Sequence, residues 1–330
     1  AEGLRKTLAS VAAQTYAHIE HIIVDGGSTD GSVEIIREYD STNGSQGGGS
    51  QTGQTSRTIQ TGRTKVCHQI RWISEKDKGI YHAMNKGIEI ALGKRIVNED
   101  HTSIPIALSP HRLIASDYIQ ILNSGDILAA NDVTERMVEA MRRQGYQASR
   151  LSGDKVPIEN GVAIFYGNMI KEWPDGKRVK DTCGGGEYTP ESFLYFYKGT
   201  LNHDCAYIRS DLFEKYGLYN EDMKICSDWE WYVRAIVLGG EKTVYTNIDV
   251  TVFDMTGISE SNGKNKDIII KERREYLESI LPAAVLRDYD RYCFPIEQYQ
   301  RLKKYHLWGL VWFVERVIFK IEKWAMGNGR

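Results

Sequence analysis

Four aspartates stand at positions where a folded chain could use them for chemistry. Asp25, Asp77 and Asp126 each follow a short apolar run, in IEHIIVDGG, IRWISEKDKG and DYIQILNSGD. Asp228 opens a strongly patterned stretch, SDWEWYVRAIVL. Ligands of open α/β sheets bind beyond the carboxyl ends of the strands, so three such carboxylates can converge at one edge of a sheet.

Each carboxylate suits a different task, and each also has a purely structural interpretation. Asp25 could accept hydrogen bonds from the edge of a nucleobase, or it could simply hold its own turn. A lone Asp126 can serve Mg²⁺ when a substrate diphosphate and water supply the other ligands. Asp228 could act as a general base in a cleft, or could only favour the helix dipole. Asp77 lies in a charged segment, so its structural interpretation is a surface loop exposed to solvent.

An α/β frame is needed to bring these residues together, and the pattern of the chain predicts one. Helical and extended patterns alternate, with expected elements at 4–11, 19–24, 32–39, 70–74, 80–92, 118–122, 163–180 and 228–238. This order indicates an α/β fold with a mostly parallel sheet flanked by helices. The chain is predicted to be helical from about Asp267 onward.

Composition shifts divide the chain. We expect a catalytic domain over 1–260 and a C-terminal helical region over 261–330. Within the first, 41–69 is predicted to be a flexible insert because Ile59 is its only aliphatic residue before Val66, and 94–116 is a second insert. The chain begins inside an amphipathic helix without an initiator Met, which we interpret as an N-terminally truncated fragment.

Bulk composition excludes several functional classes. Hydrophobic residues at 41% and charged residues at 26% describe a soluble globular chain, and a net charge of −2 provides no basic field for nucleic acid. Five scattered cysteines favour reduced thiols and a cytoplasmic location. The end of the chain, LWGLVWFVERVIFKIEKW, suits either peripheral contact with a membrane surface or a helix packed on the catalytic domain.

Four stretches together resemble the family 2 inverting glycosyltransferases of the GT-A fold. They are SVAAQTYAHIEHIIVDGGSTDGS, SEKDKGIYHAMNKGIEIALG, DYIQILNSGD and LNHDCAYIRSDLFEKYGLYNEDMKICSDWEWYVRA, in the order of the family. The resemblance implies a Rossmann-like nucleotide-binding half and transfer of a sugar from a nucleotide-diphosphate sugar to a glycan or lipid-linked acceptor. Bacterial surface polysaccharide biosynthesis is the expected setting.

The resemblance also implies a role for individual residues. Asp228 matches the catalytic base, and Asp126 matches the last carboxylate of a motif that binds a divalent cation, Mg²⁺ or Mn²⁺. His203 and Trp229 are expected to bind substrate. The donor-binding residues implied are Asp25, Gly27, Ser28, Asp77, Asn85 and Gly125.

Departures from the family pattern keep a second hypothesis open. The family begins with a central strand that this chain lacks, and Asn123 and Gly125 stand where further acidic residues are usual. The alternative is therefore a catalytically inactive nucleotide-sugar-binding or scaffold protein. A nicotinamide-dependent oxidoreductase is excluded, because DGGSTDG lacks the GxGxxG spacing.

Overall fold

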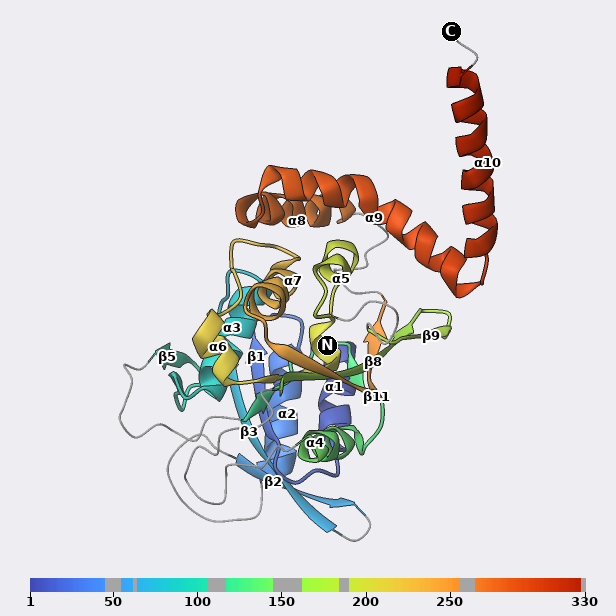
Figure 1. Cartoon of the computed structure of the whole chain (residues 1–330). Coiled ribbons are helices and arrows are strands. Elements are labelled where there is room, and N and C mark those ends of the chain that lie inside the picture. The colour runs from blue at the N-terminus through green and yellow to red at the C-terminus, as the bar shows by residue number, and fades with distance from the viewer. Residues whose placement is uncertain are drawn as a thin grey trace. The chain divides into compact units, whose positions relative to one another are not determined.

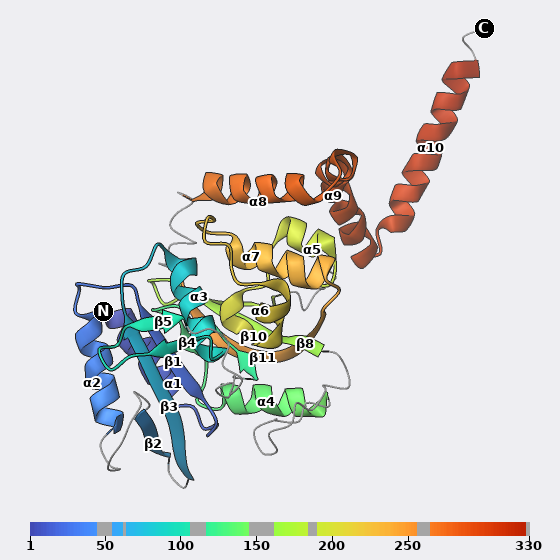
Figure 2. The same cartoon turned by 90° about the vertical axis from the view of Figure 1, so that its left-hand side faces the viewer.

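The computed structural model divides into two compact units, Ala1–Arg273 and Arg274–Arg330 (Figures 1 and 2). The division falls after Arg273, where the sequence predicted a boundary after residue 260. The residues that the structure describes are 1–44, 55–61, 64–105, 117–144, 162–183, 190–255 and 265–327.

The first unit opens with a parallel β–α–β arrangement. Its elements are α1 (Glu2–Ala12), β1 (Glu20–Asp25), α2 (Ser32–Gly44), β2 (Thr55–Thr61) and β3 (Thr64–Ser74). β1 pairs in parallel with β3, so that Asp25 lies opposite Ser74 at the carboxyl end of both strands. The apolar faces predicted from sequence close into one buried cluster of Leu8, Ile23, Ile35, Ile36, Ile70 and Trp72.

Part of the predicted flexible insert 41–69 is a β-hairpin, which corrects that expectation. β2 pairs antiparallel with β3, from Thr55 opposite Ile70 to Thr61 opposite Thr64. The insert has few aliphatic residues, but its threonines and Ile59 are β-branched and favour extended backbone. Residues 45–54 and 62–63 lie outside the described residues.

Helix α3 (Ile80–Ala91) packs on β1, with Gly87 at the contact. A Cβ atom at Gly87 would lie 3.3 Å from Val24 Cγ2, so the helix approaches the strand as closely as its side chains allow. The second predicted insert contributes a two-stranded antiparallel ribbon, β4 (Arg95–Val97) and β5 (Ser103–Pro105). Residues 106–116 lie outside the described part.

A second sheet follows, with strand order β6-β10-β8-β11-β7 and with β9 paired to β8. Its strands are β6 (Tyr118–Ile119), β7 (Ile127–Leu128), β8 (Val162–Glu172), β9 (Arg178–Asp181), β10 (Ala206–Arg209) and β11 (Lys242–Asp254). Among the described strands of this sheet, β8 and β11 are the one parallel pair. The α/β class is confirmed, whereas the expected mostly parallel sheet is corrected. The predicted hairpin over 163–180 is β8 with β9, and such tight turns make antiparallel pairs.

Helices cover this sheet and carry the remaining site residues. They are α4 (Val133–Arg143), α5 (Phe193–Lys198), the 3₁₀ turn η2 (His203–Cys205), α6 (Asp211–Tyr216), α7 (Ser227–Tyr232) and the π-helical η3 (Val233–Leu238). The predicted helix over 228–238 is therefore α7 continued by η3. Trp229, Trp231 and Tyr232 are fully buried and hold α7 rigidly.

The C-terminal part of the chain is helical, as predicted. Its helices are α8 (Lys266–Ile280), which begins in the first unit, α9 (Ala283–Lys304) and α10 (Trp308–Gly327). None of the helices in the described ranges is long and apolar enough to cross a membrane.

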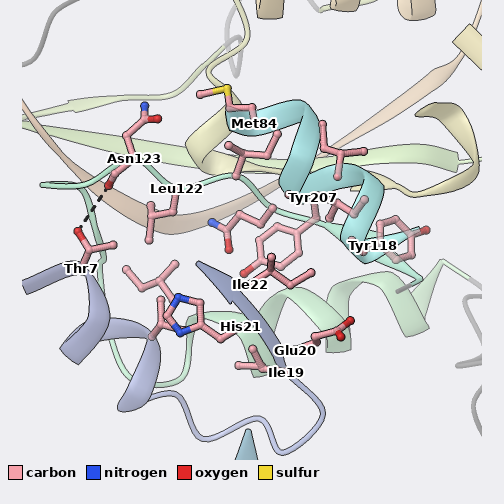
Figure 3. Close-up of a pocket in the computed structure, with 18 of the residues that line it drawn as sticks. Thr7, Ile19, Glu20, His21, Ile22, Met84, Tyr118, Leu122, Asn123 and Tyr207 are labelled. Atoms are coloured by element: carbon pink, nitrogen blue, oxygen red, sulfur yellow. Dashed lines mark hydrogen bonds between the residues drawn. The ribbon is translucent and has the colours of Figure 1, made fainter. Parts of the chain in front are cut away.

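The two larger sheets of the first unit are not joined by any strand of the described residues. β1 is the edge of one sheet and β6 is the edge of the other. A cavity of about 950 Å³ is lined by β1, by residues 117–124 and by helices α3 and α4. Figure 3 shows Glu20, His21 and Ile22 on one side of it and Tyr118, Leu122 and Asn123 on another.

Candidate active site

Asp228 lies in the first turn of α7, with contacts to both carboxylate oxygens. His203 Nδ1 lies 3.0 Å from its Oδ2, and the Tyr81 hydroxyl lies 3.2 Å from its Oδ1. This hydroxyl has one proton, and the carbonyl oxygen of Ile225 is a second acceptor within its reach. Three elements, α3, η2 and α7, thus fix one carboxylate, which borders a cavity of about 480 Å³.

The charge of Asp228 is set by its histidine partner. Burial acts to raise the pKa of Asp228, but the hydrogen bond and charge of His203 outweigh it and hold this pKa below its ordinary value. Burial acts in turn to lower the pKa of His203, while Asp228 raises it, and the net shift is upward. Asp228 is therefore ionised at neutral pH, as a general base must be.

Asp126 is presented by a turn that α1 supports. Thr7 Oγ1 donates to the Asp126 carbonyl oxygen at 2.8 Å and accepts from the Gly125 N–H at 2.9 Å. Gly125 has φ 117°, a backbone conformation that favours glycine. The carboxylate is buried, and its Oδ1 accepts from the Asp254 N–H at 2.9 Å. Burial, together with the charge of Asp204, raises the pKa of Asp126 to about 7.

One side chain joins the surroundings of Asp126 and Asp228. His203 Nε2 lies 3.1 Å from Asn123 Nδ2, at the start of the turn that ends in Asp126. With Nδ1–H donating to Asp228, Nε2 accepts from the Asn123 amide. A doubly protonated ring is accommodated by turning this amide so that its oxygen faces Nε2. The structure thus brings together three residues predicted as site residues, far apart in sequence.

The residues around Asp126 fit a metal site that depends on a substrate. Within the described ranges, no group of three or more His, Cys, Asp or Glu side chains is arranged to hold a metal ion. Asp126 is nevertheless a buried carboxylate whose charged form is disfavoured, and Asp204 Oδ1 has no hydrogen-bond partner among the described residues. A divalent cation would remove the cost of that charge. The site therefore fits one protein carboxylate completed by a diphosphate and water.

Asp25 holds the turn that follows β1. Its Oδ2 accepts from the N–H groups of Gly27 and Ser28, both at 3.0 Å, and from Ser74 Oγ at 2.7 Å. Burial acts to raise the pKa of Asp25, but the hydrogen bonds from Ser28 and Ser74 lower it below its usual value. Gly27 has φ 81°, which favours glycine. The turn-holding role is thus observed, and contact with a nucleobase stays a prediction.

Asp77 meets the same turn from the next loop. A Cβ atom at Gly26 would lie 2.2 Å from Asp77 Oδ2, so only glycine leaves room for this approach. Asp77 Oδ1 accepts from the Gly79 N–H at 3.0 Å, which fixes the carboxylate at the start of α3. Two of the loops predicted to bind the donor are therefore in contact.

Two predicted site residues have structural contacts. Asn85, predicted to bind the donor, is buried, and its amide clamps the backbone of Tyr219 through bonds of 2.9 Å and 3.0 Å. Trp229, predicted to bind substrate, is 1% exposed and donates from Nε1 to the Phe196 carbonyl at 2.7 Å. Trp229 still lines the cavity beside Asp228.

Tyr81 is a contact of Asp228 that the sequence pattern does not predict. Tyr81 and Asp228 are 147 positions apart in the sequence, so no local pattern predicts their contact. The only signal was its place in the stretch SEKDKGIYHAMNKGIEIALG, which carried part of the resemblance.

Comparisons with known proteins find similarity to glycosyltransferases. Residues 1–101 match the family described as glycosyl transferase family 2. The chain is 26% identical over 261 residues to an uncharacterized glycosyltransferase of Mycobacterium tuberculosis, covering 78% of this chain and 72% of that protein. It is 22% identical over 265 residues to a PGL/p-HBAD biosynthesis glycosyltransferase of Mycobacterium bovis, covering 80% and 75%.

A solved structure with some likeness is that of S. aureus TarS 1-349. The TM-score is 0.48 at 14% sequence identity, over 86% of this chain. The chain spans 64% of that TarS chain, slightly less than two thirds.

Proposed function

We propose that this chain, whose residues 1–101 match the family described as glycosyl transferase family 2, is an inverting, metal-dependent enzyme of that family. Its donor is a nucleotide-diphosphate sugar and its acceptor a glycan or lipid-linked hydroxyl compound. The observation that supports this best is the line from Asp228 through His203 to Asn123, which connects an ionised carboxylate with the Asp126 turn. An inverting transferase needs a base and a leaving-group site side by side.

The chemistry follows from these positions. Asp228 takes the proton from the acceptor hydroxyl while that oxygen attacks the anomeric carbon, opposite the departing diphosphate. A single displacement inverts the stereocentre, so no protein nucleophile is required. A divalent cation held by Asp126 supplies Lewis acidity toward the leaving diphosphate when bound. The turn of Asp25, Gly27 and Ser28, with Asp77 beside it, holds the nucleoside end of the donor.

A cell-envelope glycan is the acceptor class that we propose. One similar mycobacterial protein is described as acting in PGL/p-HBAD biosynthesis. We further propose that α10 lies on the cytoplasmic membrane surface, where such acceptors are assembled. Its exposed side chains support this: they include Trp312, Phe313 and Phe319, with Arg316 and Lys320 among them.

The decisive experiment is a donor panel. Nucleotide release and sugar transfer from UDP-, GDP- and dTDP-sugars are measured with Mg²⁺, Mn²⁺ or chelator, for the wild type, Asp126→Ala and Asp228→Asn. We expect metal-dependent turnover of one donor, lost in Asp126→Ala and reduced about 10²- to 10⁴-fold in Asp228→Asn. Glu139→Gln, an exposed site on α4, is the matched control.

The same experiment can overturn the proposal. Full activity of Asp228→Asn would exclude it as the base. Donor binding by calorimetry without turnover of any donor would favour the inactive binding protein instead. Retention of the anomeric configuration in the product, read by NMR, would contradict the single displacement.

A further inference from the structure

We infer that His203 is a positioning residue that ties the catalytic base to the turn carrying Asp126, rather than a residue that binds substrate. The inference rests on the proposed function and replaces the role that the sequence suggested for His203. It concerns how the position of Asp228 is fixed relative to the turn that ends in Asp126.

The ring of His203 has no polar atom left for a substrate. Nδ1 lies 3.0 Å from Asp228 Oδ2, and Nε2 lies 3.1 Å from Asn123 Nδ2. An imidazole has only these two nitrogens, and both have protein partners at hydrogen-bond distance. The ring is also largely buried, with 15% of its side chain exposed, so its orientation is fixed by these contacts.

His203 therefore connects Asp228 with Asn123 through a continuous chain of polar contacts. On one side, the Asp228 carboxylate is held between His203 and the Tyr81 hydroxyl, which come from η2 and α3. On the other side, Asn123 begins the turn in which the Asp126 N–H donates to the Asn123 carbonyl at 3.1 Å. A shift of the turn on donor binding is transmitted to Asp228 through one imidazole ring.

Other groups near Asp228 do not compete for this role. Burial is the leading cause that raises the pKa of Tyr81, Tyr219 and Tyr232, and it raises the pKa of Cys226 to about 12. All four stay uncharged at neutral pH. The hydrogen bond and charge interaction with His203 lower the pKa of Asp228.

The test compares His203→Gln and Asn123→Ala with the wild type, singly and combined. We expect His203→Gln to lower kcat about 10- to 100-fold, because a displaced base costs that much, while the donor Kd by calorimetry changes less than threefold. The acid limb of the kcat/KM profile should move to higher pH, since Asp228 loses the partner that lowers its pKa. Asn123→Ala should reduce kcat less, and should add little in the His203→Gln background.

A raised KM for donor or acceptor, with kcat and the acid limb unchanged, would overturn the inference and restore a substrate-binding role. Loss of kcat in proportion to lost thermal stability, with an unmoved acid limb, would reduce His203 to a structural residue. Additive effects of the two substitutions would show that His203 and Asn123 act independently, which would contradict the inference.

A readout without activity separates this inference from the proposed function. The His203 ring is titrated by NMR in the wild type and in Asp228→Asn, and is assigned by the signal lost in His203→Gln. We expect its pKa to fall in Asp228→Asn, because the carboxylate that raises it is gone. An unchanged pKa would refute the contact, whereas silence of the wild type across the donor panel would refute only the proposed function.

Discussion

At the scale of single residues, Asp126 shows a conflict between stability and function. Its pKa of about 7 in the fold lies above the ordinary value of 3.8, so the folded chain favours the protonated form. The contribution of this group to stability is complete below about pH 4 and is lost as the pH rises through 7. A buried charge then remains, and a cation is the natural partner for it.

We predict that Asp126→Asn stabilises the chain at pH 8 without divalent cation and changes little near pH 4. The amide keeps an acceptor for the Asp254 N–H but carries no charge. Differential scanning calorimetry should show a Tm at pH 8 that is several degrees higher than that of the wild type. This corresponds to a gain in the free energy of unfolding of about 2 kcal/mol. Addition of Mg²⁺ with a nucleoside diphosphate should raise the Tm of the wild type alone.

The control for this prediction is Asp175→Asn, in the exposed turn between β8 and β9, whose Tm should follow the wild type at both pH values. A lower Tm of Asp126→Asn at pH 8 would show that the carboxylate is stabilising in its charged form. The argument that the buried charge of Asp126 requires a cation would then fail.

The position of a residue at the end of a strand or the start of a helix is easier to predict from sequence than the contacts that it makes. Asp25, Asp126 and Asp228 were singled out because turn residues after strands and at a helix start are local features. The partners that set their chemistry are not local: Asn123 and His203 are 80 positions apart. Asn85 was assigned to the donor because its stretch resembled the family, yet its amide is used to hold Tyr219.

At the scale of elements, α8 supports the segment that leads into α7. The Glu272 carboxylate accepts from the N–H groups of Lys224, Ile225 and Cys226, at 2.6, 3.1 and 2.9 Å. Three backbone donors ahead of the helix are satisfied by one side chain from another helix. The placement of Asp228 therefore depends on α8.

We predict that Glu272→Ala lowers the free energy of unfolding by about 1–3 kcal/mol, because it leaves these donors without a charged acceptor. It should also lower kcat, since Asp228 follows the segment directly. Urea unfolding and steady-state kinetics measure both effects. Asp267→Asn, exposed on the same helix, is the control; an equal effect in the control would mean that α8 tolerates no change of charge.

The elements themselves were predicted in part. The helices at 80–91 and 227–238 were predictable because apolar residues recur along them at helical spacing, which is the main sequence signal for a helix. The direction of strand pairing was wrong, because short strands such as Tyr118–Ile119 and Ala206–Arg209 give no sign of which neighbour they meet. The hairpin at 55–74 was missed because threonine-rich strands look like polar linkers.

At the scale of the whole molecule, α10 in the second unit has many exposed apolar side chains. Apolar side chains are exposed along its length, at Leu310, Trp312, Phe313, Val314, Val317, Ile318, Phe319 and Ile321. The Arg316 guanidinium lies 4.5 Å from the centre of the Trp312 ring, which leaves its charge near the aromatic surface. Aromatic and basic side chains together suit the interface of an anionic bilayer.

We predict that the full chain floats with vesicles containing anionic lipid and that a chain ending at His306 does not. The single variant Phe319→Glu should weaken flotation, since it puts a charge into the apolar surface. Glu315→Gln, on the same helix, should not weaken it. Equal flotation of the full and shortened chains would remove α10 from the membrane proposal, as would binding that ignores lipid charge.

The two unjoined sheets have a consequence for how this protein behaves at high concentration. β1 and β6 are the last strands of their sheets among the described strands, and a cavity with apolar side chains in its lining lies beside them. Apolar surface of this kind favours association between molecules. We predict that the sedimentation coefficient of this protein rises with concentration and that short apolar β-strand peptides reduce the rise. A coefficient that is the same at all concentrations would contradict this prediction.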